Sequence, residues 1–282
     1  METRIASAKK EVIIGNGHPT VLIGERINPT GKKRLAGALK AGDLEVVRAE
    51  ALAQAQAGAD IIDINISTFG VDEVSLLPEA VRAVMATVDL PLCLDCANAE
   101  ALAAALKVYK GKALVNSVTA EEASLARVLP LVKEYGAAVI GLVQDDEGIP
   151  RDAARRVAIA GKIVSRAGAA GIPREDIIID CLAFAVGAEA ASGAAVIEAI
   201  RRIRGELGVN VTLGASNISF GLPERDRLNR AFVAIAIAAG ATCLIADVAR
   251  VRPAVLAADL ILGHDPRARR YIASYRQGQN PA

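Results

Sequence analysis

Residues 57–66 read AGADIIDINI. They follow a segment with helical spacing, 39–57, and the glycine at position 58 is a typical helix C-cap signal. The apolar run that comes next is too short for a helix and rich in isoleucine, as a strand buried on both faces should be. The stretch therefore predicts a helix, a turn and a buried strand whose end carries Asp63 and Asn65.

The same pattern recurs along the chain. The strand-like runs are VLIGERI (21–27), IIDINI (61–66), LCLDC (92–96), ALVNSV (113–118), AVIGLV (138–143), IIIDC (177–181), VTLGASN (211–217) and TCLIAD (242–247). Segments with helical spacing lie between them, at 39–57, 98–109, 121–135, 152–170, 189–206 and 225–239. Eight strand–helix units in 282 residues predict an α/β fold, a (β/α)8 TIM barrel. A doubly wound open sheet is the alternative, but the glycine fingerprint expected after its first strand is absent.

The rest of the chain is assigned around this barrel. Residues 1–20 are expected to form an N-terminal extension with a short hairpin that caps the barrel bottom. A single barrel domain is expected over 21–270, and a loosely ordered C-terminal tail over 271–282. No stretch has the composition of a domain linker.

Composition excludes several classes of function. The net charge is +1 and aromatic residues make up 3% of the chain, so nothing favours nucleic-acid binding. The longest uncharged run, 231–246, is too short to span a membrane, and the N-terminus lacks an apolar core of signal-peptide type. Four cysteines in a chain of this length predict reduced thiols and a cytoplasmic location.

Polar residues follow nearly every predicted strand. Because a barrel carries its chemistry at the carboxyl ends of its strands, these positions are candidates for a site. Each one alone is more often a turn residue, but carboxylates inside apolar runs are costly to bury without a partner. The set comprises Glu25, Asn28, Asp63, Asn65, Asp95, Asn98, Asn116, Asp180, Asn217 and Asp247.

The residue types at this mouth limit the ligand. The only histidines, His18 and His264, lie at no strand end. The mouth therefore lacks the histidine that a histidine metal site or a Ser-His-Asp triad requires. Two ligands remain open. One is a magnesium ion held by carboxylate oxygens, and the other is a flat molecule with several N–H donors, such as a pterin.

The stretch PLCLDCAN, residues 91–98, contains an apparent C-x-x-C. Side chains alternate along a strand, so Cys93 and Asp95 share one face while Cys96 points to the other. A chelating or redox pair needs both sulfurs on one side. The cysteines are therefore predicted to fill the core, with Asp95 facing the mouth.

One basic cluster, Lys32-Lys33-Arg34, follows the first predicted barrel strand. It is by default a solvated loop. If it lies at the barrel mouth, it is placed to meet an anionic ligand tail or an acidic partner.

Several motifs together resemble a known family. They are GERINPTG (24–31), DIN (63–65), LCLDCAN (92–98), VNS (115–117), IIID (177–180) and GASNISFGLPER (214–225). In this order they resemble the methyltetrahydrofolate-binding methyltransferases, which include the folate domain of cobalamin-dependent methionine synthase and enzymes that serve corrinoid proteins. These belong to the dihydropteroate-synthase-like barrels. The resemblance covers residues 11–265, and SNISFGLPER is its most specific element.

The resemblance implies a role for each matched residue. Asn217 matches the catalytic asparagine near N5 of the folate, the atom that loses the methyl group, and Arg225 matches an arginine at the pocket rim. The remaining strand-end residues are implied to bind methyltetrahydrofolate directly or to support those that do. They are Glu25, Asn28, Asp63, Asn65, Asp95, Asn98, Asn116 and Asp180, of which Asp95, Asn116 and Asp180 resemble the pterin-gripping residues.

The resemblance also implies the reaction and its partners. Methyltetrahydrofolate or tetrahydrofolate is the expected substrate, and a cob(I) corrinoid on a separate protein is the expected methyl partner. A separate protein is expected because no corrinoid-binding domain is recognisable here, and it is expected to dock over the barrel mouth because the methyl group would face outward there. A homodimer without bound metal, nucleic acid or membrane contact is also expected.

Two positions depart from the family pattern, and other functions stay open. Cys181 stands where the family often has proline, and Ser67 replaces a glycine. The Ser-Arg-Lys and late Arg-x-His elements of true dihydropteroate synthases are absent. The alternatives are another pterin enzyme on the same barrel, a magnesium-dependent aldolase, or a non-catalytic folate-binding subunit.

Overall fold

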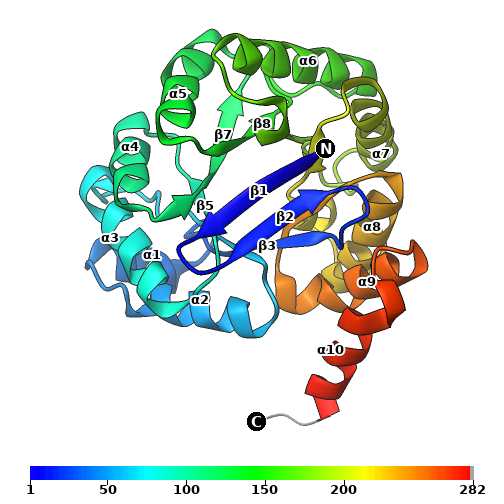
Figure 1. Ribbon diagram of the computed structural model, residues 1–282, viewed down its shortest axis with the longest axis horizontal. Coiled ribbons are helices and arrows are strands. Elements are labelled where there is room, and N and C mark those ends of the chain that lie inside the picture. Colours follow the sequence, from blue (N-terminus) through cyan, green and yellow to red (C-terminus); the bar gives the residue numbers. More distant parts are fainter. Residues whose placement is uncertain (280–282) are drawn as a thin grey trace.

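The computed structural model describes residues 1–279, and a ring of parallel strands lies at its centre (Figure 1). Hydrogen bonding joins the strands in the order β10-β9-β8-β7-β5-β4-β3-β11, and a parallel bridge between Gly214 and Ile245 links the two ends of the sheet. Every run predicted as a strand contributes to this ring, which confirms the (β/α)8 barrel. The strands are β3 (Val21–Ile27), β4 (Ile61–Ile64), β5 (Leu92–Asp95), β7 (Leu114–Thr119), β8 (Ala138–Leu142), β9 (Ile177–Asp180), β10 (Asn210–Thr212) and β11 (Cys243–Ala246).

Helices surround the ring on its outer side (Figure 1). They are α1 (Lys33–Lys40), α2 (Glu45–Gln56), α3 (Glu73–Thr87), α4 (Ala99–Val108), α5 (Glu122–Tyr135), α6 (Ala153–Ala169), α7 (Ser192–Arg202), α8 (Arg225–Ala239) and α9 (Val248–Ile261). A last helix, α10 (Arg269–Gln279), lies beyond α9 and projects away from the ring (Figure 1). Short helical turns add η1 (Arg174–Asp176), η2 (Ile203–Leu207), η3 (Ala215–Ser219) and η4 (Pro266–Ala268). Within residues 1–279, no helix has the length and apolar character needed to cross a membrane.

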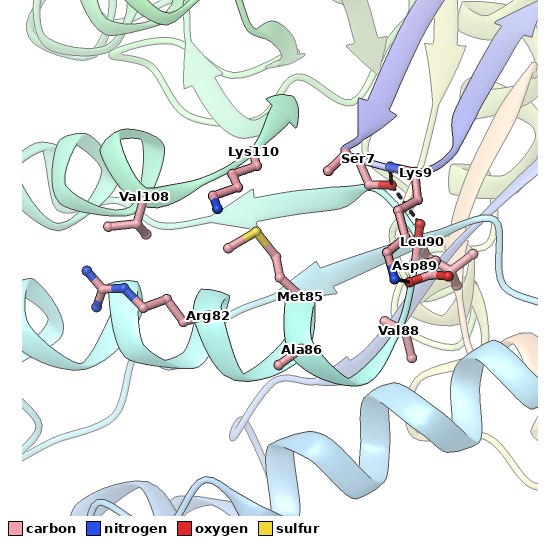
Figure 2. A pocket seen from close by; sticks show the side chains of 11 residues that line it. Ser7, Lys9, Arg82, Met85, Ala86, Val88, Asp89, Leu90, Val108 and Lys110 are labelled. Carbon is pink, nitrogen blue, oxygen red and sulfur yellow. Dashed lines mark hydrogen bonds and ion pairs between the residues drawn. The ribbon is translucent and has the colours of Figure 1, made fainter.

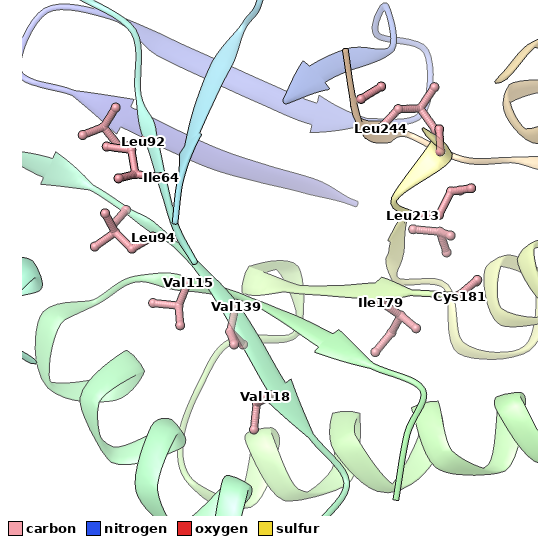
Figure 3. Packing of buried hydrophobic residues seen from close by; sticks show 14 of the residues in the cluster. Ile64, Leu92, Leu94, Val115, Val118, Val139, Ile179, Cys181, Leu213 and Leu244 are labelled. Atoms are coloured by element: carbon pink, nitrogen blue, oxygen red, sulfur yellow. The ribbon is translucent and has the colours of Figure 1, made fainter. Parts of the chain in front are cut away.

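The strands are buried on both faces, as their composition predicts. Outward-facing side chains such as Leu94, Val115 and Ile179 pack beneath the helices (Figure 3). Inward-facing side chains from the amino ends of the strands form a second core inside the barrel. Cys93 belongs to the inner core and Cys96 to the outer one, so the two thiols face opposite ways and form no clip.

The N-terminal extension forms a hairpin across the barrel bottom. Strands β1 (Glu2–Ser7) and β2 (Glu11–Gly15) pair antiparallel, and β6 (Gly111–Lys112) joins the free edge of β1. Ile5 and Ile14 of the hairpin are fully buried in the inner core. Figure 1 shows the two strands lying across this end of the ring. The expected plug is therefore present, and it fills the end of the barrel opposite the predicted site.

Residues 57–66 fold as their sequence predicts, with a helix end, a turn and a buried strand. Helix α2 ends at Gln56, and Gly58 adopts a φ of 91°, a left-handed conformation that disfavours any residue with a Cβ. The chain then turns into β4, where Ile61, Ile62 and Ile64 are fully buried. Asp63 is the polar residue of this strand, and it points toward the barrel interior.

The C-terminal segment is more ordered than its sequence suggests. Residues 269–279 form α10, although a loose tail is expected from 271, and residues 280–282 lie outside the described part of the chain. The Asp265 carboxylate accepts hydrogen bonds from the backbone N–H groups of Arg270 and Tyr271, at 3.1 and 3.0 Å. Arg270 also lies 3.6 Å from carboxylate oxygens of Asp60 and Asp259. These side-chain contacts, which no local periodicity reveals, attach the helix.

The hairpin plug should contribute strongly to stability. Ile14→Ala removes a fully buried side chain, and we expect the free energy of unfolding to fall by about 2–4 kcal/mol. Ile261→Ala, at a site 83% exposed, is the matched control and should change it by less than about 0.5 kcal/mol. Urea denaturation followed by circular dichroism measures both. Equal effects of the two substitutions would contradict the role of the plug.

Candidate active site

The predicted acids meet at the mouth of the barrel. Asp63, Asp95 and Asp180 stand at or near the carboxyl ends of β4, β5 and β9. Asp63 and Asp180 are 2% and 4% exposed, and Asp95 is partly buried. Parallel strands deliver these side chains to one end of the ring, so residues far apart in the sequence lie at the same mouth, although none of the three is among the residues that line the cavity there.

Two amides are hydrogen-bonded to two of these carboxylates. Asn65 Nδ2 donates to Asp95 Oδ2 at 2.9 Å, and Asn116 Nδ2 donates to Asp63 Oδ1 at 3.3 Å. The backbone N–H of Ser67 donates to Asn65 Oδ1 at 2.8 Å, which fixes the orientation of that amide. Ser67 replaces a glycine of the family pattern, and this difference preserves the contact between Asn65 and Asp95.

Burial dominates the electrostatics of the Asp63–Asp95 pair. It raises the pKa of Asp63 well above its ordinary value, and the neighbouring charge of Asp95 raises that pKa further. Burial also raises the pKa of Asp95. Within residues 1–279, no lysine, arginine or histidine forms an ion pair with either carboxylate. The pair is therefore suited to a ligand that brings its own N–H donors or positive charge.

Asp180 is held in place by the loop that follows it. Burial raises the pKa of Asp180 to about 7, and the backbone N–H of Leu182 donates to its carboxylate at 2.7 Å. The fully buried Arg156 donates to the carbonyl oxygens of Cys181 and Leu182, at 2.9 and 3.1 Å. Cys181 N–H donates to the Thr212 carbonyl at 3.1 Å, a bond that proline could not make. Cys181, where the family often has proline, thus adds a hydrogen bond next to the ends of β9 and β10.

The side chain of Glu25 lies at the barrel mouth, next to an irregularity in the hydrogen bonding between β3 and β4. The pairing of β3 with β4 shifts register between Gly24 and Ile27. Gln54 of α2 accepts a hydrogen bond from Arg26 N–H at 2.9 Å and occupies the space that a Cβ at Gly24 would need. Ser216 Oγ donates to Glu25 Oε1 at 2.6 Å, while burial raises the pKa of Glu25.

A cavity of about 410 Å³ opens beside these residues. Four predicted site residues line it, and they are Glu25, Asn28, Asn217 and Arg225. Asp247, a strand-end candidate for which the resemblance implied no role, also lines it. Sequence reasoning did not assign the other lining residues to the site, and they are Arg26, Thr30, Lys32, Ser216, Phe220 and Asn229. Lys32 belongs to the basic cluster. Asn229 is buried inside α8, where no sequence signal separates it from a core position.

Asn217 lies on the helical turn η3, since β10 ends at Thr212 and not at residue 217 as the sequence suggests. Its amide makes no hydrogen bond to any described residue. The amide lies close to the backbone of Gly214, where an added Cβ would approach Asn217 Nδ2 to 2.9 Å. The side chain is exposed and lines the cavity, so both of its polar atoms can reach a ligand.

Arg225 is directed toward the turn that carries Asn217. Its Nε donates to Ser219 Oγ at 3.0 Å, and its Nη2 donates to the Ser216 carbonyl at 2.8 Å. The guanidinium carbon also lies 5.7 Å from the centre of the Phe220 ring. Arg225 therefore lies at the predicted rim and also holds η3 in position.

The two remaining asparagines serve the local backbone. Asn28 Oδ1 accepts from Thr30 N–H at 3.0 Å at the cavity edge. Asn98 is the N-cap of α4, where its Oδ1 accepts from the N–H groups of Glu100 and Ala101 at 3.0 and 3.3 Å. Asn98 is exposed and is not among the residues that line the cavity, so its contact with substrate stays a prediction.

A second cavity, of about 400 Å³, lies at the opposite end of the barrel (Figure 2). It is bounded by the tip of the hairpin and by the last turns of α3 and α4. Lys9 Nζ lies 2.8 Å from Asp89 Oδ1, and Ser7 Oγ donates to the Asp89 carbonyl at 2.7 Å. None of the strand-end acids lines this cavity, so the candidate site is the mouth.

Residues 1–279 contain no cluster of three or more histidine, cysteine, aspartate or glutamate side chains arranged to hold a metal ion. At the mouth, Asp63 and Asp95 are instead hydrogen-bonded to amides.

These features define a (β/α)8 barrel whose mouth combines buried carboxylates and amides and suits a ligand rich in N–H donors. Residues 24–247 match the family described as pterin binding enzyme, and the chain belongs to that family. The matched range runs from Gly24, beside Glu25, to Asp247 at the end of β11, so it includes every predicted strand-end residue.

Two curated relatives are similar over most of the chain. A methylcorrinoid:tetrahydrofolate methyltransferase of Eubacterium limosum is 32% identical over 269 residues, covering 92% of this chain and 97% of the relative. A methionine synthase of Mycobacterium tuberculosis is 32% identical over 265 residues, covering 89% of this chain but 22% of that longer protein.

Solved structures share the fold at lower identity. A Yersinia pestis dihydropteroate synthase has a TM-score of 0.71 at 18% identity, covering 93% of this chain and 98% of the other. A Xanthomonas albilineans dihydropteroate synthase has a TM-score of 0.70 at 22% identity, covering 93% and 99%. At such identities the likeness establishes the barrel and not its activity.

Replacing Asp63 should stabilise the protein at alkaline pH. Because the pKa of Asp63 is raised on folding, the native state holds more protons than the unfolded chain, and stability falls as pH rises above about 4. Asp63→Asn removes the buried charge, so we expect the free energy of unfolding at pH 8 to rise by about 1–2 kcal/mol. The gain should shrink toward pH 4, as measured by urea denaturation across pH.

Asp72→Asn is the matched control for this experiment. Asp72 is exposed, and a hydrogen bond from Ser75 lowers its pKa, so its linkage has the opposite sign. If Asp63→Asn raised the free energy of unfolding by the same amount at every pH, the buried charge of Asp63 would not be the cause.

Proposed function

We propose that the protein transfers a methyl group between N5 of methyltetrahydrofolate and the cob(I) corrinoid of a separate protein. The observation that carries the proposal is the combination, at one mouth, of amide-bonded buried carboxylates with the unengaged amide of Asn217. The name of the Eubacterium limosum relative, with which the chain aligns almost from end to end, supports the same reaction.

The pterin ring is proposed to bind the acids and amides of the mouth. The N3–H and 2-amino groups of a pterin form a two-donor edge, which a carboxylate can accept in a bidentate manner. Asp95, Asn116 and Asp180 are proposed to hold the ring, with Asn65 and Asp63 fixing the first two through hydrogen bonds. Desolvation makes the acids good acceptors for such donors, because an unpaired buried charge is costly.

Asn217 is proposed to assist the departure of N5. When the methyl group passes to the acceptor, the electron pair of its bond to N5 stays on N5. An unprotonated N5 would leave as an anion, which is a poor leaving group, whereas a protonated N5 leaves as a neutral amine. An amide can donate an N–H to N5 or, after turning, accept from a protonated N5. Bonding by Arg225 would keep η3 in place during this change.

The corrinoid supplies the nucleophilic metal centre when the partner is bound, so no side chain of this chain needs to become covalent. Glu25 and Asp63 are proposed to lie near the bound folate and to stabilise positive charge on it. The cavity beside Asn217 opens outward, which leaves room for the partner to approach from solvent.

A cytoplasmic homodimer is also proposed. All four cysteines are free and buried, which fits a reducing compartment. An apolar groove of about 670 Å³ between α7 and α8 includes Leu228 and Ile235, which are 36% and 51% exposed. A second copy covering this groove would remove both side chains from water.

Asn217→Ala should separate chemistry from binding. We expect kcat for methyl transfer to free cob(I)alamin to fall about 100-fold, while the Kd for methyltetrahydrofolate changes by less than about threefold. Stopped-flow spectroscopy measures the transfer, and titration calorimetry measures the binding. A wild-type protein that binds the folate but transfers no methyl group would favour the folate-binding subunit instead, and one that does not bind it would end the proposal.

Folate binding should depend on the ionisation of Asp180. Its pKa of about 7 means that the carboxylate form, which accepts the pterin donors, becomes populated as pH rises from 6 to 8. We expect the affinity for methyltetrahydrofolate to rise about tenfold over this interval. Asp180→Asn should bind more weakly and lose most of the dependence. An affinity that is constant from pH 6 to 8 in the wild type would contradict this role.

A further inference from the structure

The rim of the mouth carries a row of cations at α1. Residues 28–42 contain Lys32, Lys33, Arg34 and Lys40 and no acidic residue. Lys32 turns inward, where its Nζ donates to the Arg26 carbonyl at 2.7 Å. Lys33, Arg34 and Lys40 are exposed, and no carboxylate in the described part of the chain forms an ion pair with them. This segment therefore presents unneutralised positive charge to solvent.

An exposed aromatic side chain lies beside this charge. Phe69, in the loop between β4 and α3, is 93% exposed, more than any other large apolar side chain of residues 1–279. Lys40 Nζ lies 5.7 Å from the centre of its ring. Both residues follow the carboxyl ends of neighbouring strands, β3 and β4, so they stand on the mouth side of the barrel.

A similar arrangement occurs on the other side of the cavity. Phe220, which follows η3, is 70% exposed and lies 5.7 Å from the Arg225 guanidinium carbon. In the barrel, the loops after β3 and β11 lie between the loops that carry Phe69 and Phe220. The cavity thus lies between two exposed aromatic side chains, each with a cation near its ring.

Exposed aromatic side chains near the centre of a charged surface have the properties of binding hot spots. Phenylalanine gives a large apolar contact at a small cost in conformational entropy, and uncompensated cations accelerate encounter with an acidic surface. A bare solvated loop would account for the lysines but not for an aromatic ring left almost fully in water. Phe220 has a role in lining the cavity, whereas Phe69 lines none of the cavities at the mouth.

We propose that Phe69 and the cations Lys33, Arg34 and Lys40 form the docking surface for the corrinoid-bearing protein. This inference rests on the proposed function. The charge implies that the partner presents an acidic rim, and Phe69 implies an apolar depression within that rim. Docking there places the partner over the adjoining cavity, where Asn217 is exposed.

The test compares two methyl acceptors. One is a purified corrinoid-loaded protein on which the wild-type enzyme is active, and the other is free cob(I)alamin. Phe69→Ala should raise the KM for the protein acceptor about tenfold and leave turnover with free cob(I)alamin unchanged. Ile261→Ala, which removes another highly exposed apolar side chain, at the end of α9, is the matched control and should change neither.

Charge reversal tests the electrostatic part. Lys33→Glu combined with Arg34→Glu should raise the KM for the protein acceptor and reduce its dependence on salt, without affecting free cob(I)alamin. The proposal is overturned if Phe69→Ala uses the protein acceptor as well as the wild type does, or if it loses turnover with both acceptors. It is also overturned if Phe69→Ala changes the molar mass in light scattering, since the surface would then join two copies of this chain.

Failure of the proposed function gives a different result. A wild-type protein that transfers methyl to neither acceptor overturns both proposals together. Transfer to free cob(I)alamin with no effect of Phe69→Ala on the protein acceptor overturns the docking surface alone.

Discussion

Burial of every barrel strand on both faces is the constraint on which the structure depends. One face of each strand packs under helices, and the other faces a narrow barrel interior. At the bottom, apolar side chains and the hairpin fill that interior. At the top the apolar filling stops, and the inward positions of β4, β5 and β9 are acids. The same alternation of side chains therefore produces the core and the site, and a shift of one residue in register would destroy both.

The acids at the mouth oppose folding while they suit binding. Burial raises the pKa of Asp63, Asp95 and Asp180, and within residues 1–279 none of the three carboxylates forms an ion pair. The charge of the nearby Arg156 offsets only part of this rise at Asp180. A ligand with several N–H donors would form hydrogen bonds with these carboxylates. The free energy of unfolding that their burial costs the free protein would then contribute to the affinity for the ligand. Amide partners keep this arrangement ordered in the meantime. The cost is concentrated on a few side chains, while the isoleucine-rich strands around them supply the compensating burial.

Much of this architecture could be predicted from the sequence. Eight apolar runs located the strands, and side-chain alternation placed Cys93 and Cys96 on opposite faces. The missed features depend on individual side-chain hydrogen bonds, which the spacing of apolar residues does not show. Asn217 lies on a helical turn held by Arg225, although it looks like a strand-end residue in the sequence. Asn98 caps α4, and its contact with substrate stays a prediction. The order of α10 depends on Asp265 and Arg270, and Asn229 has the same local pattern as a core residue.

The hairpin at the barrel bottom makes the two ends of the chain depend on each other. Asn210 Nδ2 donates to Thr3 Oγ1 and to the Ile14 carbonyl, both at 2.9 Å, and the hairpin also packs against Cys243. The hairpin therefore has no complete surface to cover until β11, more than 220 residues later in the sequence, has also been made. Closing such long loops slows folding, so the hairpin is among the last elements of the barrel to be buried. Until then, its apolar strands are exposed to any other chain nearby.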